Sequence, residues 1–214
     1  MRCIDMQTWS RREHFALFSA FDHPQFGMSA NVDISAFYRA VKERGHSINL
    51  AIVYVLSRAA NAIPEFRYRI RPGGVVEHET VHPATTIMAE ADAFSFCYFE
   101  HNEDFLEFIT RAAERVDHYR RHPTLQDEPG RDDYLFMTAI PWVSFTSFMH
   151  PTHLQPGDSV PRFAWGKFFE DGESLKMPLQ VQGHHALMDG VHVGEFYGEV
   201  ETMLHHPESI MGDP

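Results

Sequence analysis

The most constraining feature of this 214-residue chain is a hydrophobic pattern that changes its period near residue 185. Between residues 175 and 182 apolar and other residues alternate, which predicts a strand with one buried face. After Asp189 the apolar residues recur at helical spacing. The sequence HHALMDG, at 184–190, joins the two patterns. We therefore predict a strand, a pair of histidines, a turn with a glycine, and a helix carrying Val193, Phe196, Val200 and Met203.

The two histidines are the first candidates for chemistry. If the alternation continues, His185 lies on the buried side of the strand and His184 on the polar side. A buried imidazole that is neutral near pH 7 is a natural proton acceptor. A histidine that only fills the core is the alternative. The predicted strand before the motif and the predicted helix after it together favour a chemical role. A metal site of His184, His185 and Asp189 is a further alternative, disfavoured because these residues offer too few ligands.

Composition narrows the class of protein. Hydrophobic residues make up 43% of the chain and include 18 phenylalanines, enough for a sizeable core. No repeat or linker divides the sequence, so we expect one domain over residues 1–214. A formal net charge of −12 argues against a nucleic-acid partner. Apolar runs are too short for a membrane span. The N-terminus lacks the apolar core of a signal peptide, and the two cysteines form no disulfide framework, so we expect a cytoplasmic protein.

The order of the expected elements indicates the fold class. Residues 21–28 are expected to form a loop, and Pro72-Gly73-Gly74 predicts a hairpin. Ser35 is expected to cap a helix that Gly45 stops. Other helices are predicted at 47–63 and 103–120, and strands at 30–34, 84–89, 94–99, 134–140 and 162–169. This order predicts α/β architecture of the α+β two-layer sandwich type, a mixed β-sheet packed with helices, rather than regular βαβ alternation.

Two further features need partners. The segment Trp9–Phe15 is aromatic and contains two arginines, and a packed arginine needs a carboxylate. Thr138 places one hydroxyl inside an apolar run, where an unpaired hydroxyl costs about 1–3 kcal/mol. The hydroxyl either bonds the backbone of its own sheet or points at a reaction centre, and the run alone favours the first.

Taken together, the motifs resemble the chloramphenicol acetyltransferases of the trimeric, non-hexapeptide type. The resemblance covers about residues 8–205. H-x-x-x-D-G alone also occurs in dihydrolipoamide acyltransferase cores and peptide-synthetase condensation domains, so the other blocks narrow the choice. The blocks are WSRREHF (9–15), NVDI (31–34), ANAIPEFR (60–67), IPWVSF (140–145), GKFF (166–169) and HHALMDG (184–190).

The resemblance implies a reaction and its residues. His185 would be the general base that deprotonates a substrate hydroxyl as the oxygen attacks the acetyl thioester of CoA. The transfer would occur in a ternary complex without an acyl-enzyme, with acetyl-CoA as co-substrate and no permanently bound cofactor. Asp189 would pair with Arg11 and order the loop that fixes the imidazole. Thr138 stands where the family has a serine that stabilises the oxyanion, a role worth roughly 3 kcal/mol.

The resemblance also implies binding pockets and an assembly. Leu17 and Phe18 align with an aromatic pair of the acceptor pocket, Phe26 lies in the loop that follows, and Phe148 and His150 complete the pocket. Phe168 aligns with an aromatic residue that packs on the adenine of CoA. The implied assembly is a homotrimer with each active site between subunits.

Three hypotheses remain open at this point. The chain acetylates chloramphenicol or a related hydroxyl compound, or it uses the same scaffold for another acceptor, or it is a non-catalytic binding homologue. The changed pocket, with His150 in place of an apolar residue and no tyrosine hydroxyl at Phe18, supports acetyl-CoA chemistry better than it supports chloramphenicol as the acceptor.

Overall fold

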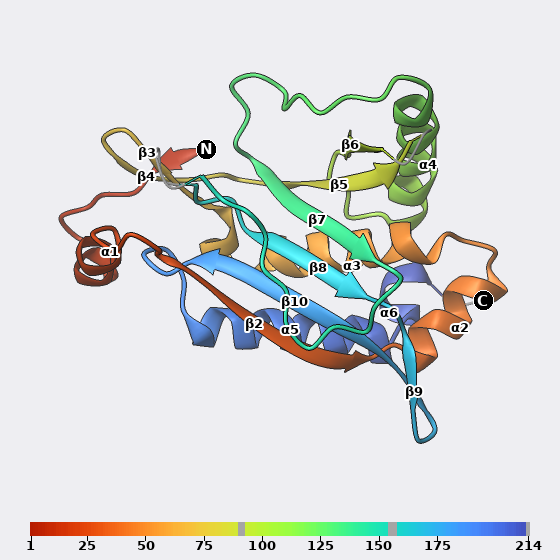
Figure 1. Ribbon diagram of the computed structural model, residues 1–214. Coiled ribbons are helices and arrows are strands. Elements are labelled where there is room, and N and C mark those ends of the chain that lie inside the picture. Colours follow the sequence, from red (N-terminus) through yellow and green to blue (C-terminus); the bar gives the residue numbers. More distant parts are fainter. Residues whose placement is uncertain (90–92, 154–157, 213–214) are drawn as a thin grey trace.

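A computed structural model describes residues 1–89, 93–153 and 158–212 (Figure 1). A mixed seven-stranded sheet, in the order β2-β10-β8-β7-β5-β6 with β9 beside β10, forms its centre. The strands are β2 (Gln25–Asp33), β5 (His82–Met88), β6 (Phe94–Tyr98), β7 (Tyr134–Ile140), β8 (Arg162–Gly166), β9 (Phe169–Asp171) and β10 (Ser174–His184). A smaller sheet contains β1 (Arg2–Cys3), β4 (Gly74–Glu77) and β3 (Tyr68–Arg71).

The main helices pack on one face of the larger sheet (Figure 1). They are α2 (Ser35–Glu43), α3 (Ile48–Ala62), α4 (Phe105–Arg121) and α5 (Gly190–His205). Three shorter helices complete the chain, namely α1 (Arg12–Phe18), the 3₁₀ turn η1 (Pro64–Arg67) and α6 (Glu208–Met211). The predicted mixed sheet packed with helices is therefore present. Within the described ranges, no helix has the length and apolar character needed to cross a membrane.

Strand β10 organises the sheet. It pairs antiparallel with β2 from Lys176↔Asp33 to His184↔Gln25, and with β8 from Leu179↔Trp165 to Gln182↔Arg162. Leu179 and Val181 join the core beneath α3 and α5, as the alternation predicts.

The predicted polar face of β10 is not open to solvent. Gln180, Gln182 and His184 are 1%, 3% and 4% exposed. The segment after β7 crosses the sheet on the face opposite the helices and covers Gln180 and Gln182 (Figure 1). His184 lies on the polar face as predicted, but the expectation that only one face of this strand is buried was wrong, because a period of two identifies the two faces of a strand without showing what covers each one.

Several predicted elements are confirmed with small shifts at their ends. The predicted helix at 47–63 is α3, with Ser47 as its N-cap, and the hairpin at Pro72-Gly73 joins β3 to β4. The helix after Asp189 is α5, and Asp189 is its N-cap. Ser35, by contrast, lies inside α2. The carboxylate of Asp33 accepts from the Ser35 backbone N–H at 2.9 Å and so does the capping expected of Ser35.

Two strand boundaries differ from the prediction. Residues 25–28 belong to β2 and not to a loop, because the long β10 offers them partners from Val181 to His184. The single strand expected over 162–169 is divided into β8 and β9. The backbone N–H of Lys167 donates to Val143 O at 2.9 Å, so the chain leaves β8 to bond the crossing segment.

Candidate active site

His185 is the first residue after β10, and aromatic rings hold it in place. Its ring stacks on Phe18 with centroids 3.9 Å apart and planes 5° apart, and it contacts Phe26 at 4.6 Å. Its backbone N–H donates to Pro24 O at 2.8 Å. The residue is half-buried, so part of it remains open to solvent. Its Nδ1 atom is buried and has no hydrogen-bond partner within the described residues.

His184 has a different environment. Its Nδ1 accepts from the backbone N–H of Ala186 at 3.2 Å. Burial lowers the pKa of His184 to about 4, against the opposing charge of Asp158 and with a small contribution from His185. The side chain is therefore neutral at pH 7 and helps to shape the turn, which leaves His185 as the accessible histidine of the pair.

Asp189 connects the turn after His185 to the start of the chain. Arg11 Nη1 donates to Asp189 Oδ2 at 2.8 Å, so the ion pair expected between these residues is present. The Val191 N–H donates to Asp189 Oδ1 at 3.2 Å and closes the first turn of α5. Partial burial acts to raise the pKa of Asp189, but the hydrogen bond and charge of Arg11 outweigh it and hold the pKa below its usual value.

Thr138 lies in the middle of β7, on the face of the sheet opposite the helices. Its hydroxyl is 3.4 Å from that of Thr86 on β5, so within the described residues it bonds a neighbouring side chain and not the sheet backbone, while its role at a reaction centre stays a prediction. The register places Thr138 beside Ala164 of β8, and Ala164 beside Gln180 of β10. These residues form a row across the sheet.

The same register separates Thr138 from His185 within one chain. Strands lie about 4.8 Å apart and rise about 3.3 Å per residue. His185 is two strands away from Thr138 and five residues beyond Gln180, so roughly 19 Å separate the Cα atoms of Thr138 and His185. A hydroxyl and an imidazole at this separation do not act on one carbonyl. One copy of the chain therefore does not bring these two predicted catalytic residues together.

The predicted acceptor-pocket residues form two groups. Phe26 and Phe148 line one cavity of about 220 Å³ between the sheet and the crossing segment. Phe148 packs edge-on against His150, with centroids 4.8 Å apart. Leu17, 57% exposed, and Phe18, which stacks on His185, lie on α1 and form the second group.

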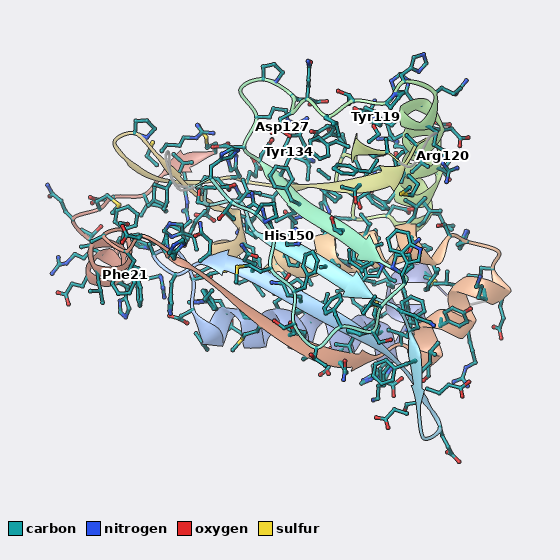
Figure 2. All side chains as sticks on the ribbon, in the orientation of Figure 1. Phe21, Tyr119, Arg120, Asp127, Tyr134 and His150 are labelled. Atoms are coloured by element: carbon teal, nitrogen blue, oxygen red, sulfur yellow. The ribbon has the colours of Figure 1, made fainter. Side chains whose placement is uncertain are left out.

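His150 is fixed over the sheet by two polar contacts (Figure 2). Its backbone N–H donates to Gln182 Oε1 at 2.9 Å, and its Nε2 donates to Phe163 O at 3.2 Å. Burial, and to a smaller extent the charge of Arg162, lowers the pKa of His150 to about 4. The ring is thus a neutral, tethered part of the wall.

Phe168 lies between β8 and β9, half-buried, with Tyr38 edge-on at 6.1 Å. Its side chain packs against the hydrophobic core. The predicted contact of Phe168 with the adenine of CoA stays a prediction. In the described ranges no group of three or more His, Cys, Asp or Glu is placed to hold a metal ion.

Sequence reasoning missed two residues of this region. His192 accepts from the Asp189 backbone N–H through Nδ1 at 3.1 Å, which completes a capping box around the turn. Its position three residues after an Asp N-cap is a recognisable signal. Gln180 has no comparable signal, because its polar side chain suggested solvent and the crossing segment that buries it comes from far along the chain.

Comparison with known proteins agrees with this geometry. A family model described as chloramphenicol acetyltransferase matches residues 1–201. A chloramphenicol acetyltransferase of Klebsiella sp. is 33% identical over 199 residues, covering 92% of this chain and 91% of the relative. A solved chloramphenicol acetyltransferase superposes with a TM-score of 0.86 at 31% identity, covering 95% of this chain and 100% of that one.

A more distant neighbour shares the fold alone. The truncated catalytic core of a 2-oxoacid dehydrogenase complex from Thermoplasma acidophilum superposes with a TM-score of 0.68 at 12% identity, covering 97% of this chain. The predicted fold class is thus confirmed by a close and a distant structure. With the matched family model and the whole-length relatives, these findings show that the chain belongs to the chloramphenicol acetyltransferase family.

Proposed function

We propose that this protein transfers an acetyl group from acetyl-CoA to a hydroxyl of chloramphenicol or a similar small molecule. The observation that carries the proposal is the braced, half-buried ring of His185, which follows β10 directly and precedes the Asp189–Arg11 pair. Relatives that match over nine-tenths of the chain carry the name of this activity. The protein would act in the cytoplasm, as one domain, and would confer resistance to the antibiotic.

The mechanism follows from the groups present. His185 accepts the proton of the acceptor hydroxyl while the oxygen attacks the thioester carbonyl. A tetrahedral intermediate forms, and the hydroxyl of Thr138 donates a hydrogen bond to its oxyanion. The intermediate collapses, the C–S bond breaks, and the proton on His185 passes to the sulfur of CoA. No covalent acyl-enzyme is needed, because both substrates are bound together.

The distance between His185 and Thr138 supports a site shared between copies. A homotrimer would place His185 of one copy against the row that contains Thr138 in its neighbour. Two features of the surface favour such contacts. Strand β2 forms an edge whose central residues are exposed, and an exposed edge pairs readily with another chain. Trp142 and Met149, on the crossing segment, are 68% and 81% exposed.

Acetyl-CoA would enter as the second substrate. We place its adenine near Phe168, whose ring remains half-exposed where β8 gives way to β9. Leu17, Phe18, Phe26, Phe148 and His150 would contact the acceptor.

A different hydroxyl acceptor is the second candidate. The tethered, neutral imidazole of His150 supports it, because this polar group stands in the expected acceptor wall and would favour a partner with a hydrogen-bonding group. A non-catalytic homologue would bind CoA without turnover.

The test follows thiol release from acetyl-CoA with chloramphenicol as acceptor. We expect release by the wild type and a loss of at least a thousandfold in His185→Ala. His205→Ala, which removes an exposed histidine of α5, is the matched control and should retain full activity. Release with other alcohols but not with chloramphenicol would support the second candidate. CoA binding without release for any acceptor would contradict acetyl transfer.

A further inference from the structure

The cavity under the crossing segment contains a polar group that the proposed mechanism does not use. One wall is the polar face of β2 and β10, with Ser29, Gln180 and Gln182, and the other is Thr146–Met149. Among the described residues, no charged side chain lines it. An ion bound here would lose its hydration without a counter-charge, so the cavity suits an uncharged ligand.

The two glutamines of this wall differ in their hydrogen bonds. Gln182 accepts from the backbone N–H of His150 at 2.9 Å and donates to His150 O at 3.5 Å, so it clamps the crossing segment. Gln180, two residues earlier on the same face, is 1% exposed. Both its Nε2 and its Oε1 are buried without a partner in the described ranges. A buried amide that is left unpaired destabilises a fold, so its presence calls for a ligand or a function.

The neighbouring strand β2 leaves room for the amide of Gln180. A Cβ at Gly27 would lie 3.0 Å from Gln180 Nε2, closer than ordinary packing allows. Glycine at this position of β2 therefore leaves space for the carboxamide beside the cavity.

The position of Gln180 relates the cavity to the proposed reaction. Thr138, Ala164 and Gln180 lie in one row on one face of the sheet, so the Cα atoms of Thr138 and Gln180 are roughly 10 Å apart. A volume of about 220 Å³ accommodates one arm of a drug-sized molecule but not the whole. The cavity is thus within reach of a molecule whose hydroxyl reacts near Thr138.

We propose that the carboxamide of Gln180 binds an uncharged amide or hydroxyl group on the distal arm of the acceptor. This inference rests on the proposed acetyl transfer and extends it to the class of acceptor. Both free atoms of the amide are used, because Nε2 donates to an oxygen of the ligand while Oε1 accepts from its N–H or O–H. Gln180 is therefore a specificity-determining residue rather than a catalytic one.

The experiment compares the full-length wild type with Gln180→Met, which keeps the shape of the side chain and removes its amide. Gln126→Met, at an exposed loop position, is the matched control. The probe is chloramphenicol, and its Kd is measured calorimetrically without acetyl-CoA. We expect Gln180→Met to raise the Kd, and the KM for chloramphenicol, tenfold or more. The KM for acetyl-CoA and kcat should change less than twofold, and the Tm of the free protein should rise.

An unchanged Kd, or a fall in Tm with dissociation of the assembly, would overturn the inference, because the amide would then serve folding or a subunit contact. The Kd measurement separates this result from failure of the proposed function. A wild type that binds chloramphenicol without acetylating it contradicts acetyl transfer to this acceptor, while a tenfold difference in Kd still supports the role of Gln180.

Discussion

Two arginines in different parts of the molecule have contrasting partners. Arg69 of β3 is 1% exposed and donates to four backbone carbonyls, those of Phe66, Tyr68, Asp132 and Tyr134. Arg11, next to α1, has one partner, Asp189, and its Nε and Nη2 are buried without partners in the described residues. Every guanidinium nitrogen of Arg69 thus has a partner, whereas two of the three in Arg11 have none in the described residues.

The contrast extends beyond the arginines. Apart from Arg67 Nε, every buried unpartnered side-chain atom found in the described ranges belongs to Arg11, Gln180 or His185. All three residues lie in the region that we propose to be functional. Native proteins leave few buried polar groups unpaired, and those that remain tend to mark functional sites. The comparison suggests that the Arg69 region stabilises the fold, while the region of His185 sacrifices some stability for binding and chemistry.

The largest expected effect on stability concerns Arg69. Arg69→Met would leave four buried carbonyls without their donor, so we expect the free energy of unfolding to fall by about 4 kcal/mol or more. Urea denaturation measures the loss, with the exposed Arg39→Met as control. Activity per folded molecule should be unchanged. A loss below about 1 kcal/mol would remove the distinction between the two regions.

Acidification tests the buried histidines. His150 and His184 have folded-state pKa values of about 4, below the pKa of a histidine in the unfolded chain. At a pH between the two pKa values the unfolded chain therefore binds more protons than the folded one. Stability therefore falls as pH decreases from about 7 towards 4. Between pH 7.5 and 5.5 we expect a loss of roughly 1 kcal/mol for each of the two residues. Burial also lowers the pKa values of His78 and His82, which act in the same direction.

The measurement is urea unfolding at several pH values with His184→Asn as the comparison. This variant should lose part of the slope between pH 7.5 and 5.5. An identical slope in both proteins would show that His184 is not held neutral in the folded state.

A smaller effect on stability, with a larger one on activity, is expected at Asp189. Asp189→Asn retains a side chain that caps α5 but removes the charge paired with Arg11. We expect a loss of about 1–2 kcal/mol of stability, since the pair is partly exposed, and a tenfold or greater fall in kcat because the His185 turn is less ordered. Arg12→Gln, at the neighbouring exposed arginine, is the control. A variant with unchanged kcat would show that the ion pair does not position the base.

The sequence allowed local features to be predicted well. Periodicity identified β10 and α5, and the glycine predicted the turn between them. These signals depend on residues that are neighbours in the chain. The resemblance supplied the Arg11–Asp189 pair, whose members are 178 positions apart and which no local pattern joins.

Other features depend on what a distant segment covers. The burial of Gln180 requires the crossing segment after β7, and the start of β2 requires the length of β10. The separation of Thr138 from His185 follows from strand order, which periodicity does not encode. These features could not be predicted from local sequence for this reason.

The central claim is that His185 of one copy acts beside Thr138 of another, and a mixed assembly tests it most directly. His185→Ala and Thr138→Ala chains are denatured together in equal amounts, refolded, and assayed for thiol release with acetyl-CoA and chloramphenicol. If the site is shared, about a quarter of the sites in random assemblies join two intact residues, so activity should rise far above that of either variant refolded alone. Activity equal to the mean of the two separate variants would contradict the account.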